Sequence, residues 1–64
     1  RIEAAIEALP ERQRAAITLC ALQGHGNIEA AKIMDTTVEA MEGLLGRARR
    51  KLKQVLKEQE ASGE

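Results

Sequence analysis

Residues Gly26–Lys53, GNIEAAKIMDTTVEAMEGLLGRARRKLK, hold the clearest structural pattern in this chain of 64 residues. A short apolar segment, Asn27–Met34, precedes the polar break Asp35–Thr37 and a longer amphipathic segment that becomes strongly basic. This order is typical of a helix-turn-helix, in which two helices cross. The side chains expected between the two helices are those of Ala30, Met34, Thr36, Met41 and Leu44, with Ala31 as the small residue that allows close approach.

Two further helices are predicted before this motif. Apolar residues recur at helical spacing over 2–9, and Pro10 closes that segment because the residue before a proline is disfavoured in the α region. Pro10 then suits the first turn of a second helix that runs to about Gln23, where Gly24-His25-Gly26 breaks it.

The starts of the next two helices are predicted from capping residues. Gly26 or Asn27 can cap the third helix; with Gly26 as the cap, Glu29 takes the third helical position, where a carboxylate can cap free amides. For the fourth helix, Thr36 and Glu39 have the spacing of a capping box, and Thr37 is a competing cap.

A regular apolar stripe follows in the fourth helix, with steps of three and four residues at Val38, Met41, Leu45, Ala48, Leu52 and Val55. The stripe covers less than three heptads, so packing on the preceding helices is favoured over a coiled coil. We therefore predict an all-α fold of three to four helices containing a helix-turn-helix over residues 1–57. A polar tail, 58–64, is expected to fray.

Composition excludes several classes of function. The chain has no Phe, Tyr or Trp, so it cannot bind single strands by stacking bases on aromatic rings, whereas duplex binding is not excluded. The single Cys20 cannot form an intrachain disulfide, which indicates a reducing compartment, and we expect a cytoplasmic protein. No signal peptide or membrane-spanning run is present in the sequence. Because the chain begins at Arg1, we expect it to be part of a longer protein.

A net charge of zero conceals a strong asymmetry. Residues 1–42 hold four basic and seven acidic groups, residues 43–57 hold six basic and no acidic groups, and residues 58–64 hold three acidic groups. Charge runs usually form a solvated helix face. Here Arg47, Arg50 and Lys51 cluster beside one outward side of the fourth helix, which favours contact with phosphates.

Two segments together resemble a known family. Leu9-Pro10-Glu11-Arg12-Gln13-Arg14, followed by the helix-turn-helix with Leu45-Gly46-Arg47-Ala48-Arg49-Arg50-Lys51-Leu52, resembles region four of bacterial sigma factors of the extracytoplasmic-function group. The resemblance covers residues 2–57. It implies recognition of the promoter −35 element in double-stranded DNA, contact with the β flap of RNA polymerase core, and a possible anti-sigma factor as partner.

The chain departs from that family at three places. Asp35 stands where a glycine is common, His25 where an apolar residue is common, and Glu42-Gly43-Leu44 where a polar set is common. The last of these positions resembles the part of the helix that enters the major groove. A carboxylate there either accepts a hydrogen bond from cytosine N4 or stays clear of the bases, and Glu42 permits both interpretations.

The candidate DNA-binding residues share a place on the fourth helix or at the start of the second. They are Thr37, Glu39, Glu42, Gly43, Gly46, Arg47, Arg50 and Lys51, with Arg12 and Arg14. For Thr37 and Glu39, helix capping is the stronger interpretation, and for Arg12 and Arg14, pairing with local carboxylates is equally favoured. Ile17 and Leu44 are candidate partner-binding residues if they are exposed.

Catalysis and cofactor binding have no support in the sequence. His25 and Cys20 lack a third metal donor nearby, so we expect His25 to anchor the turn and Cys20 to act as a small apolar residue. No cofactor and no enzyme activity are predicted. Two alternatives to a sigma domain stay open: a response-regulator output domain, against which the Leu9-Pro10 opening argues, and a module that chiefly binds an anti-sigma factor or the polymerase flap.

Overall fold

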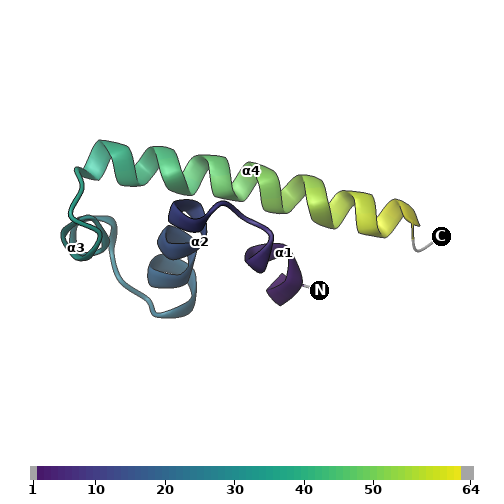
Figure 1. Ribbon diagram of the computed structural model, residues 1–64, viewed down its shortest axis with the longest axis horizontal. Coiled ribbons are helices and arrows are strands. Elements are labelled where there is room, and N and C mark those ends of the chain that lie inside the picture. The colour runs from purple at the N-terminus through teal and green to yellow at the C-terminus, as the bar shows by residue number, and fades with distance from the viewer. Residues whose placement is uncertain (1, 63–64) are drawn as a thin grey trace.

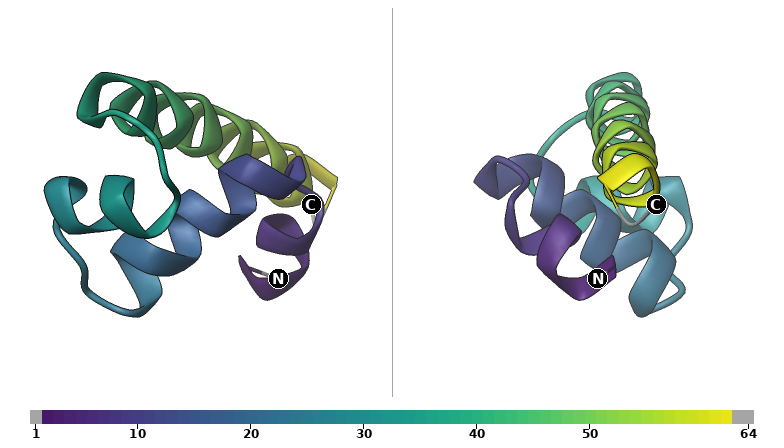
Figure 2. Two further views of the ribbon diagram at one scale, coloured as in Figure 1. Left: turned by 60° about the vertical axis from the view of Figure 1, so that its left-hand side comes forward. Right: turned by 90° about the vertical axis from the view of Figure 1, so that its right-hand side faces the viewer.

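The computed structural model describes residues 2–62, which form four α-helices and one π-helical segment, with no strand among them. The elements are α1 (Ile2–Glu7), α2 (Glu11–Ile17), η1 (Thr18–Leu22), α3 (Asn27–Ile33) and α4 (Val38–Ser62). Helix α4 is the long axis of the molecule, and α1, α2 and α3 all lie along one side of it (Figure 1; Figure 2). The predicted all-α fold with a helix-turn-helix is confirmed.

Pro10 makes the corner between α1 and α2. It is the N-cap of α2 rather than a residue of its first turn, with φ −54° and ψ 151°, an extended conformation. The Pro10 carbonyl accepts the hydrogen bond of the Arg14 N–H at 2.9 Å. The proline ring therefore fixes the backbone angle at which α2 leaves the corner.

The second helix ends in a wider, π-helical turn. The N–H of Gln23 donates to the carbonyl of Thr18 at 3.0 Å, five residues back, and the N–H of His25 donates to Leu19 at 3.0 Å. Gly24 follows with φ +79°, a left-handed conformation in which glycine meets no steric penalty. The predicted break after Gln23 is confirmed, and its cause is this left-handed residue.

The turn between α3 and α4 is a Schellman motif. The N–H of Asp35 donates to Lys32 at 3.1 Å and the N–H of Thr36 donates to Ala31 at 2.9 Å, so two terminal carbonyls of α3 are satisfied. Asp35 is the left-handed residue of the motif, with φ 55°. This geometry explains why a glycine is common at the same place in the family that the sequence resembles.

Thr37, and not Thr36, caps α4. Its Oγ1 accepts the hydrogen bond of the Ala40 N–H at 3.0 Å, and α4 begins at Val38. Of the two caps that the sequence allowed, Thr37 is the one used, and Thr36 forms no capping box with Glu39 because its backbone N–H donates to Ala31 in the Schellman turn. At the start of α3, Gly26 is the N-cap as predicted, without a side-chain cap.

The core lies where α4 crosses α2 and α3. Met41 and Ala48 are fully buried, Leu45 is 1% exposed, and the predicted stripe is half-buried at Val38, Leu52 and Val55. Ile17 and Leu44 are also in this core, 5% and 9% exposed. The exposure on which their candidate partner-binding role depended is therefore absent, because both residues lie in the helix packing.

Helix α4 extends beyond the predicted boundary at Lys57 and reaches Ser62. The helix therefore continues past the predicted boundary, and fraying of the polar tail stays a prediction. Glu, Gln and Ala are good helix formers, and they continue the helix without an apolar stripe. Residues 63–64 of the expected tail lie outside the described residues.

Candidate nucleic-acid interface

The outward side of α4 carries most of the candidate residues. At about 100° of rotation per residue, Gly43, Gly46 and Arg50 lie roughly opposite the fully buried Met41. Arg50 is exposed, as are Arg47 and Lys51, which lie toward one flank. The helix that follows the turn therefore presents its basic side chains to solvent while its apolar stripe faces α1, α2 and α3.

Three cations gather at a hollow between this flank and the α1–α2 corner. The hollow, of ≈ 450 Å³, is lined by Arg47, Arg50, Lys51 and Gln54 of α4 and by Ala8, Pro10 and Gln13 of the corner. No carboxylate is among the lining residues. Among the described side chains, the ion pair is that of His25 with Glu29. Arg47, Arg50 and Lys51 form no ion pair with a described carboxylate, so their N–H groups can bind a phosphate. We call this surface the basic hollow.

The start of α2 reaches the basic hollow through a residue that sequence reasoning missed. Gln13 lines it, whereas Arg12 is exposed elsewhere and Arg14 lies on the other side of α2. Along α2, Arg12 and Arg14 are each rotated by about 100° from Gln13, in opposite directions, so the three side chains leave the helix on different sides. Gln13 belongs to the Leu9–Arg14 motif, but its side chain is uncharged, so the charge pattern of the sequence pointed to Arg12 and Arg14 instead.

The N-terminal end of α4 is acidic on its outward side. Glu39 and Glu42 are exposed, and Thr37 is exposed with its hydroxyl oxygen already accepting the capping bond. A threonine hydroxyl that accepts from an amide can still donate its own proton. Thr37 is thus both the helix cap and a potential donor to a phosphate.

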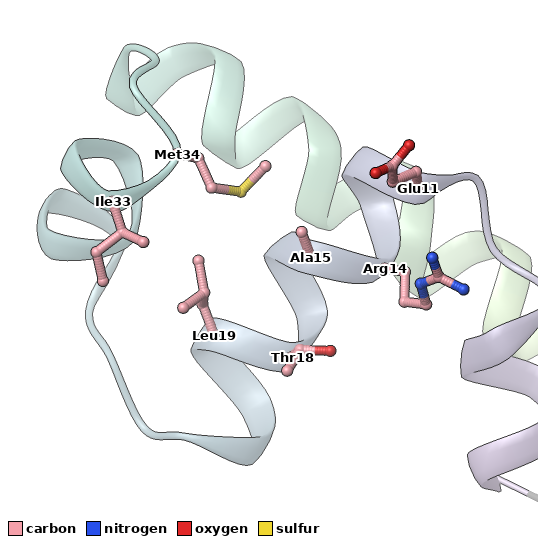
Figure 3. Close-up of a pocket in the computed structure, with 7 residues that line it drawn as sticks. All are labelled: Glu11, Arg14, Ala15, Thr18, Leu19, Ile33 and Met34. Atoms are coloured by element: carbon pink, nitrogen blue, oxygen red, sulfur yellow. The ribbon is translucent and has the colours of Figure 1, made fainter.

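A second, apolar hollow lies on the opposite side of α2. Its volume is ≈ 430 Å³, and its lining residues are Glu11, Arg14, Ala15, Thr18, Leu19, Ile33 and Met34. Figure 3 shows Leu19 of η1 and Ile33 and Met34 at the end of α3 around this hollow, with Glu11 and Arg14 of α2 at its edge. Ile33 is 53% exposed. Leu19 and Met34 are half-buried. We call this surface the apolar hollow.

His25 anchors the turn before α3, as the sequence predicted. Its Nδ1 lies 2.8 Å from Oε1 of Glu29, and because a carboxylate only accepts, Nδ1 carries the proton. Glu29 therefore pairs with His25 and does not cap the backbone of α3. Cys20 is half-buried, with its Sγ 3.9 Å from Oδ1 of Asn27.

The described residues contain no group of three potential ligands that could hold a metal ion. No helix within them is long and apolar enough to cross a bilayer.

Comparison with known proteins identifies the motif. The family described as "Sigma-70, region 4" matches residues 1–52, which include the α1–α2 corner and the helix-turn-helix. The chain belongs to the sigma-70 region 4 family. A comparison with curated proteins finds no match. Region 4 is the DNA-binding domain with which a sigma factor recognises the promoter −35 element, and the family binds promoter DNA and RNA polymerase. Of the two helix-turn-helix interpretations, the match supports the sigma factor over the response regulator.

Proposed function

We propose that this region 4 domain serves an alternative sigma factor of the extracytoplasmic-function group. It places the outward side of α4 in the major groove of the −35 element and works in the cytoplasm as part of the polymerase holoenzyme. The group assignment rests on the sequence resemblance, and the observation that carries the DNA-binding role is the basic hollow, in which Arg47, Arg50 and Lys51 meet without a carboxylate. These cations neutralise phosphates and hold the register of the helix on the duplex.

The remaining candidate residues divide between capping, base contact and backbone contact. Gly46 leaves the outward side of α4 open to close approach of DNA, Gly43 lies under the Arg47 guanidinium, and Glu42 contacts cytosine or no base at all. Thr37 and Glu39 act at the helix start, where Thr37 can donate to a phosphate. Arg12 and Arg14 lie outside the basic hollow, and Arg14 lines the apolar hollow, so we assign neither a phosphate contact.

Affinity of the free domain for DNA should be low and sensitive to salt. Three phosphate contacts predict that a fourfold rise in salt lowers the binding constant about 40-fold. Specific binding then depends on polymerase, which holds the domain on the promoter and supplies the affinity that a domain of zero net charge lacks.

The test compares two arginines of α4 in the intact chain. Arg50→Ala should weaken binding to a labelled duplex uniformly and reduce the salt slope by about 1. Arg49→Ala is the matched control, because Arg49 is exposed on the same helix but does not line the basic hollow. Binding that is independent of salt, or unchanged in both Arg47→Ala and Arg50→Ala, would show that this surface does not face DNA.

A second role is supported by the apolar hollow. We propose that it receives an apolar segment of RNA polymerase core, the β flap, while α4 holds DNA. Exposed Ile33 and half-buried Leu19 and Met34 around one depression favour a helix or loop with apolar side chains. An anti-sigma factor that occupied the same surface would block assembly of the holoenzyme.

Two glutamate substitutions on α3 test the proposed contact with polymerase. Ile33→Glu should abolish binding to polymerase core and leave DNA binding intact, because Ile33 lines the apolar hollow. Ile28→Glu makes the same change at a residue that is 65% exposed but lines neither hollow. Equal loss in both variants would argue against the apolar hollow as the polymerase contact.

A further inference from the structure

Gly43 leaves the backbone of α4 bare beneath a basic side chain. A Cβ atom placed on Gly43 lies 3.4 Å from Nη1 of Arg47, 3.6 Å from Nη2 and 3.8 Å from Cζ. These are contact distances, so the guanidinium of Arg47 lies against the helix surface at Gly43. Helical geometry favours this direction, because side chains of a helix lean toward its N-terminus.

No side chain lies over Gly46. A Cβ atom placed on Gly46 has nothing within 4 Å. Both glycines lie on the outward side of α4, and each weakens the helix to a similar extent. The neighbouring guanidinium therefore distinguishes Gly43 from Gly46.

The position of the guanidinium matters because of the charge around it. Residue 43 lies about 6 Å along the helix axis from residue 47, toward the end that enters the groove. Glu39 and Glu42 place two exposed carboxylates at that end. A cation held over Gly43 offsets their repulsion of phosphates, and its five N–H donors are available to DNA.

We propose that Gly43 is a positioning residue for Arg47 in DNA binding. The bare backbone lets the guanidinium lie flat over the second turn of α4, and a side chain larger than a methyl group displaces it. This inference rests on the proposed DNA-binding function. The inference also explains why this chain carries Glu42-Gly43 where the family commonly has polar residues. The glycine lets the Arg47 cation lie near the acidic residue.

A double-mutant cycle in the intact chain tests the proposal, with affinity for a labelled duplex measured by fluorescence anisotropy at low salt. Arg47→Ala should lower affinity about 5- to 150-fold. Gly43→Leu should lower it to the same level in the parent and have no further effect in the Arg47→Ala background. Gly43→Gln, a polar side chain of similar reach, should reproduce this pattern.

Three controls accompany the cycle. Gly43→Ala should lower affinity less than Gly43→Leu does, because a methyl group lies at contact distance from the guanidinium and a longer side chain displaces it. Gly46→Leu should have the same effect on affinity in both backgrounds, since no side chain lies over it. Melting followed by circular dichroism should show Gly43→Leu at least as stable as the parent, because leucine favours helix more than glycine does.

The possible outcomes separate the inference from the function on which it rests. If Gly43→Leu lowers affinity equally with and without Arg47, bulk at residue 43 obstructs DNA directly and the inference is overturned. Loss of affinity in Arg47→Ala and Arg50→Ala with no change in Gly43→Leu also overturns it, while the proposed function stands. If neither arginine variant loses affinity, both proposals fail together.

Discussion

Replacing Leu45 with alanine should remove much of the stability of this domain. Leu45 is 1% exposed, so nearly all of its side chain is withdrawn from water. Alanine lacks the three outer carbons of leucine, and at about 0.8 kcal/mol for each buried carbon their transfer alone is worth about 2.4 kcal/mol. Any cavity left behind raises the loss further.

The surrounding core has little means of filling that cavity. Ala16, Ala30, Ala31 and Ala48 belong to the same buried cluster and are at most 2% exposed. Their methyl groups have no side-chain torsion through which to move into the space. We therefore expect a loss of about 3–5 kcal/mol, in the upper part of the range for leucine-to-alanine changes.

Leu22 provides the matched control, because it is 66% exposed and undergoes the same substitution. Leu22→Ala should cost less than about 1 kcal/mol. The assay is urea and thermal unfolding followed by far-ultraviolet circular dichroism. For a domain of this size 1 kcal/mol corresponds to about 4–8 °C, so Leu45→Ala should lower the Tm by more than about 10 °C. A Tm within about 2 °C of the parent would refute the assignment of the buried face of α4.

Three further substitutions test single features of the structure. Thr37→Ala should cost about 0.5–2 kcal/mol of unfolding free energy, and Thr36→Ala distinctly less, because only Thr37 caps α4; equal losses would contradict the assigned cap. Asp35→Ala should destabilise by about 1–2 kcal/mol and Asp35→Gly should not, since φ is 55°; denaturant midpoints decide this. Glu42→Ala should relax preference at one base pair in a promoter-library selection with holoenzyme if Glu42 reads cytosine. A uniform gain across all sequences would instead identify it as a carboxylate that only repels phosphates.

The four α-helices and the buried face of α4 could be predicted from the sequence, whereas the π-helical segment η1 and the end of α4 at Ser62 were not. Steps of three and four residues at Met41, Leu45 and Ala48 encode rotation about one helix axis, which is a local property. The break at Gly24 and the corner at Pro10 are also local, because each follows from the backbone angles that one residue permits. These features and the family resemblance could therefore be predicted without knowing how the helices pack.

Which side chains meet across helices depends on how the helices pack. Whether Arg12 or Gln13 faces Arg47 depends on how α2 is rotated against α4, and that rotation is set by packing over the whole core. The same packing buries Ile17 and Leu44, whose apolar character alone could not distinguish core from interface. The choice of Thr37 over Thr36 as the cap follows from the turn that closes α3, and the contact of Arg47 with Gly43 follows from the space that a missing side chain leaves.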